Sequence, residues 1–330
     1  MKKFLLSVNF AMLILLGVFA TTSHQEEVKC PACGSTVKLE VLSSTNNLGG
    51  MDWDFCSRAG GAQPILLIPG TCPNCYYSGY YGDFGKDVEI PKEVKQKITK
   101  DKMLKPLLEM KDDRIPAYVK YDLIAQTCIL TGKDDLRIGD QYLRGSWAVR
   151  LIWWSNMLPD DVQKEVDDIL EEHRKSKGDY ERGNDAAIRT EWGYELSAKV
   201  PGLSGNKKAY TALAAIYLLK TFGENPEVIK LLPAVKSGLK AEDYTKYEKD
   251  IMDSINQERY FQKKAVEFYE KGLPTLTKDD EISSMNYSIA ELYRRLGENE
   301  KAKKYYGESL KKGEMPEHFK IYIEGQLKTL

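Results

Sequence analysis

The sequence predicts an α+β fold that is mostly α, with a small β-rich domain followed by a larger domain of helical hairpins. Three observations lead to this prediction. Four cysteines stand in two short pairs near the start, glycine-rich strand-like pieces continue to about residue 90, and apolar residues then recur at helical spacing. With 330 residues and 42% hydrophobic content, the chain is long enough for one small domain and one larger core.

The first residues are typical of an export signal. Lys2 and Lys3 give a positive start, residues 4–20 are largely apolar, and small residues precede a polar stretch. Polar residues interrupt the apolar run, and a membrane span needs about 20 mostly apolar residues. We therefore expect residues 1–20 to be a cleaved signal peptide and the mature protein to be periplasmic or extracellular, without a stable transmembrane span. An uncleaved membrane tether is the alternative.

The two cysteine pairs predict a metal site. Each pair has the pattern Cys-Pro-x-Cys, and two residues between ligands let both sulfurs of a pair reach one ion. Two such knuckles brought together make a zinc ribbon, which has no position open for water or substrate. We expect a structural Zn²⁺ ion held by Cys30, Cys33, Cys72 and Cys75.

Export leaves the state of these cysteines open, because oxidising compartments favour disulfides. The proline in each pair and Gly34 after the first pair favour a tight metal-binding turn. A disulfide-linked form and a redox-active dithiol are the alternatives. Thioredoxin-type dithiols normally start a helix after a strand, and neither pair has that context.

The predicted secondary structure changes near residue 91. Before it, residues 36–42 and 65–68 read as strands joined by glycine turns, and after it the apolar period is helical. We therefore expect a zinc-ribbon-like domain over residues 21–90 and a helical domain over residues 91–330.

The clearest helical hairpin lies near the C-terminal end. Apolar residues recur from Met285 to Leu296, break at Gly297, and resume from Ala302 to Leu310. Small residues at the helix crossing and aromatic residues beside them make this unit resemble a tetratricopeptide repeat. Weaker copies are expected at residues 118–152 and 210–225, and residues 265–269 look like the second helix of another unit. Stacked hairpins present extended concave surfaces, so we expect a protein or peptide partner.

A polar, glycine-rich insertion is expected at about residues 175–208. Its carboxylates and arginines match no catalytic spacing, so we expect a solvated loop or inserted excursion. Histidine is scarce, and His24, His173 and His318 are each expected to be solvated surface residues.

The cysteine motifs also carry a family resemblance. Cys-Pro-x-Cys-Gly is followed by Asp52-Trp53-Asp54-Phe55-Cys56, then Cys-Pro-x-Cys, then Asp83-Phe84 ahead of repeat-like helices. This arrangement, from Cys30 through the helical region, resembles the bacterial family of unknown function DUF2225. The resemblance implies a zinc-ribbon-like head on a tetratricopeptide-like body, with no established reaction and with the four paired cysteines as the ribbon ligands.

Three residues or features depart from this simple description. Tyr76 stands where family members commonly have glycine, and the export signal is not expected of a typical member. Cys56 is a fifth thiol near the ribbon, which we expect to pack beside Phe55. Replacement of a ligand, or a disulfide with an empty knuckle, are the other interpretations, and Arg58 is the nearby cation that could activate the thiol.

The remaining composition limits the function classes. A net charge of -1 argues against nucleic-acid binding, and residues 92–111, the candidate basic stretch, are expected to be a solvated helix face or linker. No phosphate-binding loop, nucleophile elbow or zinc-protease motif is present. We therefore expect a non-enzymatic exported protein of uncharacterised role, with no catalytic residues. An envelope thiol-redox protein, or an enzyme using the cysteine-rich head, is the alternative; the sequence indicates no oligomeric state.

Overall fold

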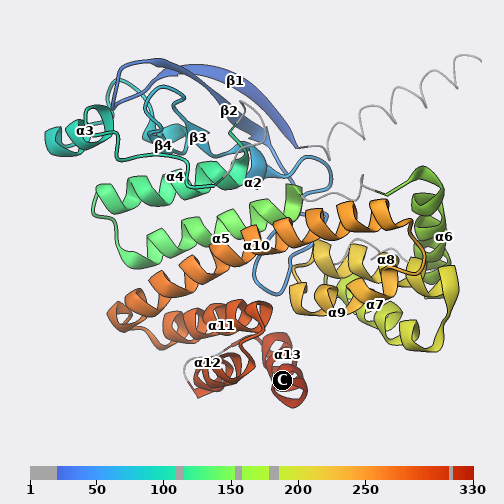
Figure 1. Ribbon diagram of the computed structural model, residues 1–330. Helices are drawn as coiled ribbons and strands as arrows, with labels where there is room; N and C mark the ends of the chain where they lie inside the picture. Colours follow the sequence, from blue (N-terminus) through green and yellow to red (C-terminus); the bar gives the residue numbers. More distant parts are fainter. Residues whose placement is uncertain (1–20, 109–114, 153–157, 178–185, 312–314) are drawn as a thin grey trace, which may run out of the picture. The chain divides into compact units, whose positions relative to one another are not determined.

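The computed structural model describes residues 21–108, 115–152, 158–177, 186–311 and 315–330 (Figure 1). The expected signal peptide, residues 1–20, lies outside the described residues. The described chain is mostly α-helical and contains two small antiparallel sheets of two strands each, which confirms the predicted fold class. Packing divides the chain into two compact units, Met1–Thr127 and Cys128–Leu330, which we call the head and the body.

Two hairpins form the β part of the head. Strands β1 (Thr22–Lys29) and β2 (Thr36–Ser44) pair so that Lys29 lies opposite Thr36. Strands β3 (Gly70–Thr71) and β4 (Ser78–Gly79) form the second, shorter hairpin. The strand expected over residues 36–42 is thus present as β2. Each hairpin turn encloses one cysteine pair, so the two turns deliver all four candidate ligands.

The strand expected over residues 65–68 is wrong. Residues 65–67 belong to the short helix α2 (Pro64–Leu67), and Ile68 is its C-cap. Proline at the first helical position has a φ suited to a helix start, and its missing N–H would have no intrahelical partner there. An apolar run of four residues is compatible with either structure, so Pro64 decides the outcome.

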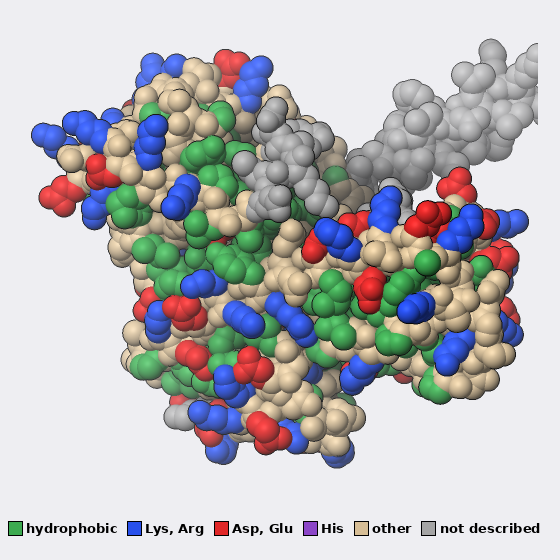
Figure 2. All heavy atoms as spheres, viewed as in Figure 1, with side chains coloured by type: hydrophobic (Ala, Val, Ile, Leu, Met, Phe, Trp, Pro, Cys, Tyr) green, Lys and Arg blue, Asp and Glu red, His purple; other side chains and the backbone are tan. Residues whose placement is uncertain are grey.

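The rest of the head is helical. It contains the 3-10 turn η1 (Tyr81–Asp83), α3 (Lys92–Thr99) and most of α4 (Ala117–Leu130), which continues into the body. On α3 the apolar Val94 and Ile98 are buried and the lysines are exposed (Figure 2), as expected for a solvated face. The buried Tyr121 of α4 donates a hydrogen bond to the backbone oxygen of Ile65, 2.9 Å away, which ties α4 to α2.

The body continues as a series of helices. Their bounds are α5 (Asp135–Ile152), α6 (Asp160–Ser176), α7 (Ala186–Lys199), α8 (Gly205–Thr221), α9 (Asn225–Val235), α10 (Ala241–Gly272), α11 (Asp279–Leu296), α12 (Asn299–Lys311) and α13 (Glu317–Thr329). Two 3-10 turns, η2 (Val200–Gly202) and η3 (Leu273–Thr275), follow α7 and α10. None of the described helices is long and apolar enough to cross a membrane.

The C-terminal hairpin predicted around Gly297 is present as α11 and α12. Gly297 ends α11 with a φ of 80°, a left-handed conformation that glycine adopts without a Cβ penalty. The Glu298 amide then donates to the backbone oxygen of Tyr293 at 2.9 Å, which completes the helix cap. Gly223, with a φ of 78°, lies in the same way between α8 and α9.

Residues 265–269 belong to a different element from the one expected. They lie within α10, a single helix of 32 residues, instead of forming the second helix of a local hairpin. Helix α10 packs along α5, although α6 to α9 lie between them in the sequence (Figure 1). Gly139 and Gly145 of α5 face the rings of Tyr269 and Phe261, and the absent side chains let the two helices approach closely.

The loop expected within residues 175–208 is wrong for residues 186–199, which form α7. Trp192 and Leu196 lie one helical turn apart, and both are buried in the apolar core shared by α6 to α10. Val200 continues this i+4 spacing, so a narrow apolar stripe is present within the polar segment. Residues 178–185 of the same segment lie outside the described part.

Candidate metal centre

The first cysteine pair forms the turn between β1 and β2. The Cys30 amide donates to the backbone oxygen of Ser35 at 2.9 Å, and the Gly34 amide donates to that of Cys30 at 2.8 Å. Gly34 has a φ of 77°, which costs glycine little and other residues about 1–2 kcal/mol. This tight turn brings Cys30 and Cys33 to the same end of the hairpin.

The second pair repeats this turn between β3 and β4. The Cys72 amide donates to the backbone oxygen of Tyr77 at 2.9 Å, and the Tyr76 amide donates to that of Cys72 at 2.8 Å. Tyr76 occupies the position of Gly34 and has a φ of 59°. The turn geometry is therefore kept even though tyrosine replaces the glycine that the family resemblance implies.

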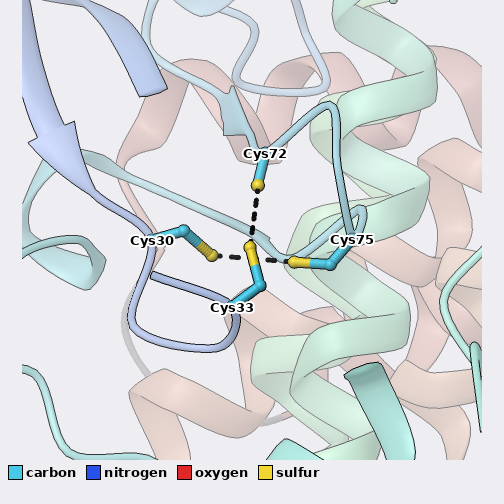
Figure 3. A group of neighbouring side chains, drawn as sticks. All are labelled: Cys30, Cys33, Cys72 and Cys75. Carbon is cyan, nitrogen blue, oxygen red and sulfur yellow. Dashed lines mark hydrogen bonds between the residues drawn. The ribbon is translucent and has the colours of Figure 1, made fainter. Parts of the chain in front are cut away.

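The two turns bring the four cysteine sulfurs together (Figure 3). All four lie within 4.8 Å of one another, and the Cys30–Cys75 and Cys33–Cys72 sulfur pairs are each 3.6 Å apart. A tetrahedral site with bonds of about 2.3 Å has ligand–ligand edges of about 3.8 Å. Disulfide sulfurs are about 2.05 Å apart, so these four are separate thiols at the spacing of a tetrahedral metal site.

The turns also hold each other through polar side chains. Asn74 Nδ2 of the second turn donates to Ser35 Oγ of the first at 3.1 Å, and the Cys33 thiol contacts the same oxygen at 3.3 Å. Cys30, Cys72 and Cys75 are buried, whereas Cys33 is only partly covered. The centre is thus mostly buried and is least covered at Cys33.

The crowded sulfurs change each other's acidity. The neighbouring Cys72 sulfur raises the pKa of Cys30 to about 12, whereas hydrogen bonds from Cys30 and Cys75 lower the pKa of Cys72 to about 2. The pKa of Cys33 is also lowered and that of Cys75 is raised, so some of the thiols keep their protons when no metal is bound. A metal ion must displace those protons, so its binding weakens as the pH falls.

The segment from Asp52 to Arg58 forms a separate loop. Arg58 donates from Nε and Nη2 to the two carboxylate oxygens of Asp52, at 2.7 and 2.8 Å, and both residues are buried. The Asp52 amide donates to the backbone oxygen of Cys56 at 2.9 Å, and Phe55 between them has a φ of 67°. Cys56 is completely buried and is not a member of the four-sulfur group, and the Arg58 cation is engaged by Asp52.

The expectation that His173 is solvated is wrong. This residue is buried in the body, and its Nε2 lies 2.9 Å from a carboxylate oxygen of Glu195. Its neighbours in the sequence are charged, so the sequence does not suggest that His173 lies on the buried face of α6. Val166, two turns earlier, lies on the same face. His24 and His318 are exposed, as expected.

The sequence also gave no indication of a buried ionic cluster in the body. Glu258 accepts hydrogen bonds from Arg150 at 3.1 Å and from Lys220 at 3.0 Å, with all three side chains completely buried. Glu224 binds Arg294 through two hydrogen bonds, the longer at 2.8 Å. These partners come from helices far apart in the sequence, so no local spacing could have revealed them.

Comparison with known families supports the resemblance stated above. Residues 24–153 match the family described as "Uncharacterized protein conserved in bacteria (DUF2225)". The resemblance, which we extended from Cys30 through the helical region, is thereby confirmed from β1 to the end of α5. Searches of curated proteins and of solved structures give no match.

Proposed function

We propose that this chain is a non-enzymatic, exported protein whose head is fixed by a structural Zn²⁺ ion and whose helical body binds a protein or peptide. The observation that carries the metal part is the group of four cysteine sulfurs within 4.8 Å of one another. Cys30, Cys33, Cys72 and Cys75 would hold the ion. The ion would neutralise the thiolates and link the two turns. Its role would be structural, because four protein ligands leave no coordination position for a substrate.

A structural role suits the composition of the head. Cys33 and Cys72 are 39 positions apart, so a metal that binds both closes a long loop. The second sheet of the head is very small, with two residues in each of β3 and β4. Small domains with little core commonly depend on a metal for their folding free energy.

Metal analysis combined with thiol counting tests this part. We expect about one zinc per purified mature chain, with the four paired cysteines becoming reactive only after chelation. Cys56→Ala is the matched control, because it removes a buried thiol outside the group and should leave the zinc content unchanged. A protein with neither zinc nor free thiols would contradict the proposal.

The alternative is an envelope thiol-redox protein. It is favoured by the partial exposure of Cys33: although burial raises its pKa, hydrogen bonds with Ser35 bring it below the ordinary value. Reversible two-electron cycling with a defined reduction potential would support this alternative. Tightly held zinc and thiols that stay inert in the metal-bound protein would support the structural role.

Partner binding by the body rests on its hairpins, which we interpret as tetratricopeptide-like. Stacks of such hairpins bind partners along extended surfaces. Ile321 of α13 is 63% exposed, and Leu310 of α12 is also exposed, so apolar side chains are available on the last helices. A pull-down from the envelope fraction should return a partner with the native protein and lose it with Ile321→Glu; equal recovery by both would place the contact elsewhere.

Export is tested by sequencing the N-terminus of the mature protein. A start just after Ala20 would support a cleaved signal. A start at Met1 would instead support the membrane-tethered alternative.

A further inference from the structure

A cavity of about 570 Å³ lies in the body between α6, α7, η2 and α8. Pockets that bind small molecules typically have volumes of about 300–1,000 Å³ and combine apolar walls with a few polar groups. The cavity is formed entirely by described residues of the body and shares none with the cysteine centre. It is therefore a candidate ligand site independent of the metal.

Part of the cavity lining is apolar. Ile169 of α6, Leu196 of α7 and Leu203 after η2 form this part. Leu196 also belongs to the apolar core of the body, and Ile169 packs against that core. The apolar wall is thus attached to the rigid part of the body and suits a hydrocarbon chain.

His173 is a polar residue of the lining, and neighbouring side chains hold its ring. Its ring lies edge-on to Trp192, with the ring centres 5.9 Å apart, and its Nε2 contacts Glu195 at 2.9 Å. Its Nδ1 lies 3.5 Å from the ammonium nitrogen of Lys199. These contacts suit a neutral imidazole that donates from Nε2 and accepts at Nδ1. Consistently, burial and then the Lys199 charge lower the pKa of His173.

The cavity carries an excess of positive charge. Lys199 and Lys207 line it, and no carboxylate among the described residues forms an ion pair with either. An ammonium group has three N–H donors, and His173 can accept only one from Lys199. Glu172 is the acidic residue among those that line the cavity. Elsewhere in the body, lysines such as Lys271 pair with a glutamate one turn away.

We propose that this cavity binds a small amphiphilic carboxylate, with its hydrocarbon chain against Ile169, Leu196 and Leu203 and its carboxylate held by Lys199 and Lys207. This inference does not depend on the metal or on a peptide partner. The neutral His173 orients Lys199 without cancelling its charge. Glu172 opposes the ligand's charge and thereby limits affinity.

Calorimetric titration of the full-length mature protein with octanoate tests the proposal, and octylammonium, of the same chain length and opposite charge, is the matched probe. Octanoate should bind saturably at one site and octylammonium should not. Lys199→Met combined with Lys207→Met should weaken octanoate binding about tenfold or more, since hydrogen bonds to charged groups are worth roughly that factor. Glu172→Gln should strengthen it. Lys236→Met, which removes an exposed lysine outside the cavity, should change nothing.

Two further variants test the location. A Cβ at Gly202 would meet no atom within 4 Å, and Ala198 is exposed, so tryptophan at either position should be tolerated by the fold and should obstruct the cavity. We expect Gly202→Trp and Ala198→Trp to abolish octanoate binding while circular dichroism stays unchanged. The proposal is overturned if octanoate does not bind, if octylammonium binds equally well, or if both folded tryptophan variants bind octanoate normally.

Discussion

The cysteine centre of the head and the buried ionic cluster of the body compensate charge in different ways. In the head, four cysteine sulfurs converge from two turns, and we propose that a metal ion neutralises their thiolates. In the body, the buried carboxylate of Glu258 lies beside Arg150 and Lys220, which belong to the same chain. The ionic cluster of the body therefore has its counterions within the chain, whereas the cysteine centre, as we interpret it, depends on a metal.

The two units also differ in apolar packing. The body has a continuous core in which residues of α6 to α10 contact one another. The head has two sheets of two strands each, with buried residues such as Val37 and Phe84 around the hairpins. We therefore infer that the two units depend on two different sources of stability, and that each source should fail under a different treatment.

The largest expected effect is the loss of a metal ligand. Cys72→Ser should abolish zinc binding and unfold the head, because structural zinc contributes about 10–16 kcal/mol in small zinc domains. The helices of the body should remain folded. Zinc content and thermal unfolding followed by circular dichroism check this, with Cys56→Ala as the control. If Cys72→Ser keeps its zinc and its unfolding profile, the head does not depend on the metal.

Breaking the buried ion pairs is the corresponding change in the body. Glu258→Gln keeps the shape of the side chain but leaves Arg150 and Lys220 without their carboxylate, and we expect a loss of about 3–5 kcal/mol in unfolding free energy. Glu267→Gln, on the same helix, removes surface pairs with Lys264 and Lys271 and should cost at most about 1 kcal/mol. Urea unfolding measures both. If both substitutions lower the unfolding free energy equally, burial does not make the ion pairs of Glu258 more important for stability.

Overpacking tests the close contact between α5 and α10. Gly145→Ala places a Cβ against the ring of Phe261, and we expect about 1–3 kcal/mol of destabilisation. Gly307→Ala on α12 meets no neighbouring atom and should stabilise the body by up to about 1 kcal/mol, because alanine favours a helix. The signs of the two changes in urea midpoint should therefore differ. Destabilisation by both would point to a general intolerance of alanine instead of a tight crossing.

Acid should disrupt the two units at different pH values. Burial alone would raise the pKa of Glu224, but Arg294 and Arg295 lower it from 4.5 to about 2. A lowered pKa gives stability that is complete above pH 4.5 and is lost as the pH falls through 2. Protons compete for the metal thiolates at higher pH. Metal release, followed with a coloured chelator, should thus precede the loss of helical circular dichroism; the reverse order would contradict the comparison.

The smallest effect is expected at Tyr76. Its left-handed conformation costs about 1–2 kcal/mol, which glycine avoids at the expense of greater chain entropy when unfolded. Tyr76→Gly should therefore change head stability by less than about 1 kcal/mol and leave zinc content unchanged. Thermal unfolding of the zinc-loaded protein provides the measurement. A large loss would mean that the tyrosine side chain itself supports the turn.

Short sequence patterns predicted those features of the fold that are determined by local backbone geometry. The Cys-Pro-x-Cys spacing and Gly34 were enough to predict the turns that bring the cysteine sulfurs together, and Gly297 was enough to predict the break between α11 and α12. The strand expected at residues 65–68 failed because Pro64 starts a helix there. The role of the cysteines as metal ligands stays a prediction.

Long-range packing could not be predicted in the same way. Helix α5 pairs with α10, and Glu258 pairs with Lys220, because particular helix faces meet in the folded chain. The spacing of residues in the sequence does not indicate which faces these are. His173 looked like a surface residue because its neighbours in the sequence are charged, yet α6 turns it toward Trp192. Both buried ionic clusters and the cavity beside His173 are consequences of tertiary packing.

Hydrogen exchange with and without a chelator tests whether a metal stabilises the head and not the body, because it reports on both units of the full-length protein in one experiment. With zinc present, amides of the two turns, such as those of Gly34 and Tyr76, should be protected by the hydrogen bonds they make. Chelation should remove this protection while α5 and α10 exchange as slowly as before. Unchanged protection of the turns after complete metal removal would contradict the account, and so would simultaneous loss of protection throughout the body.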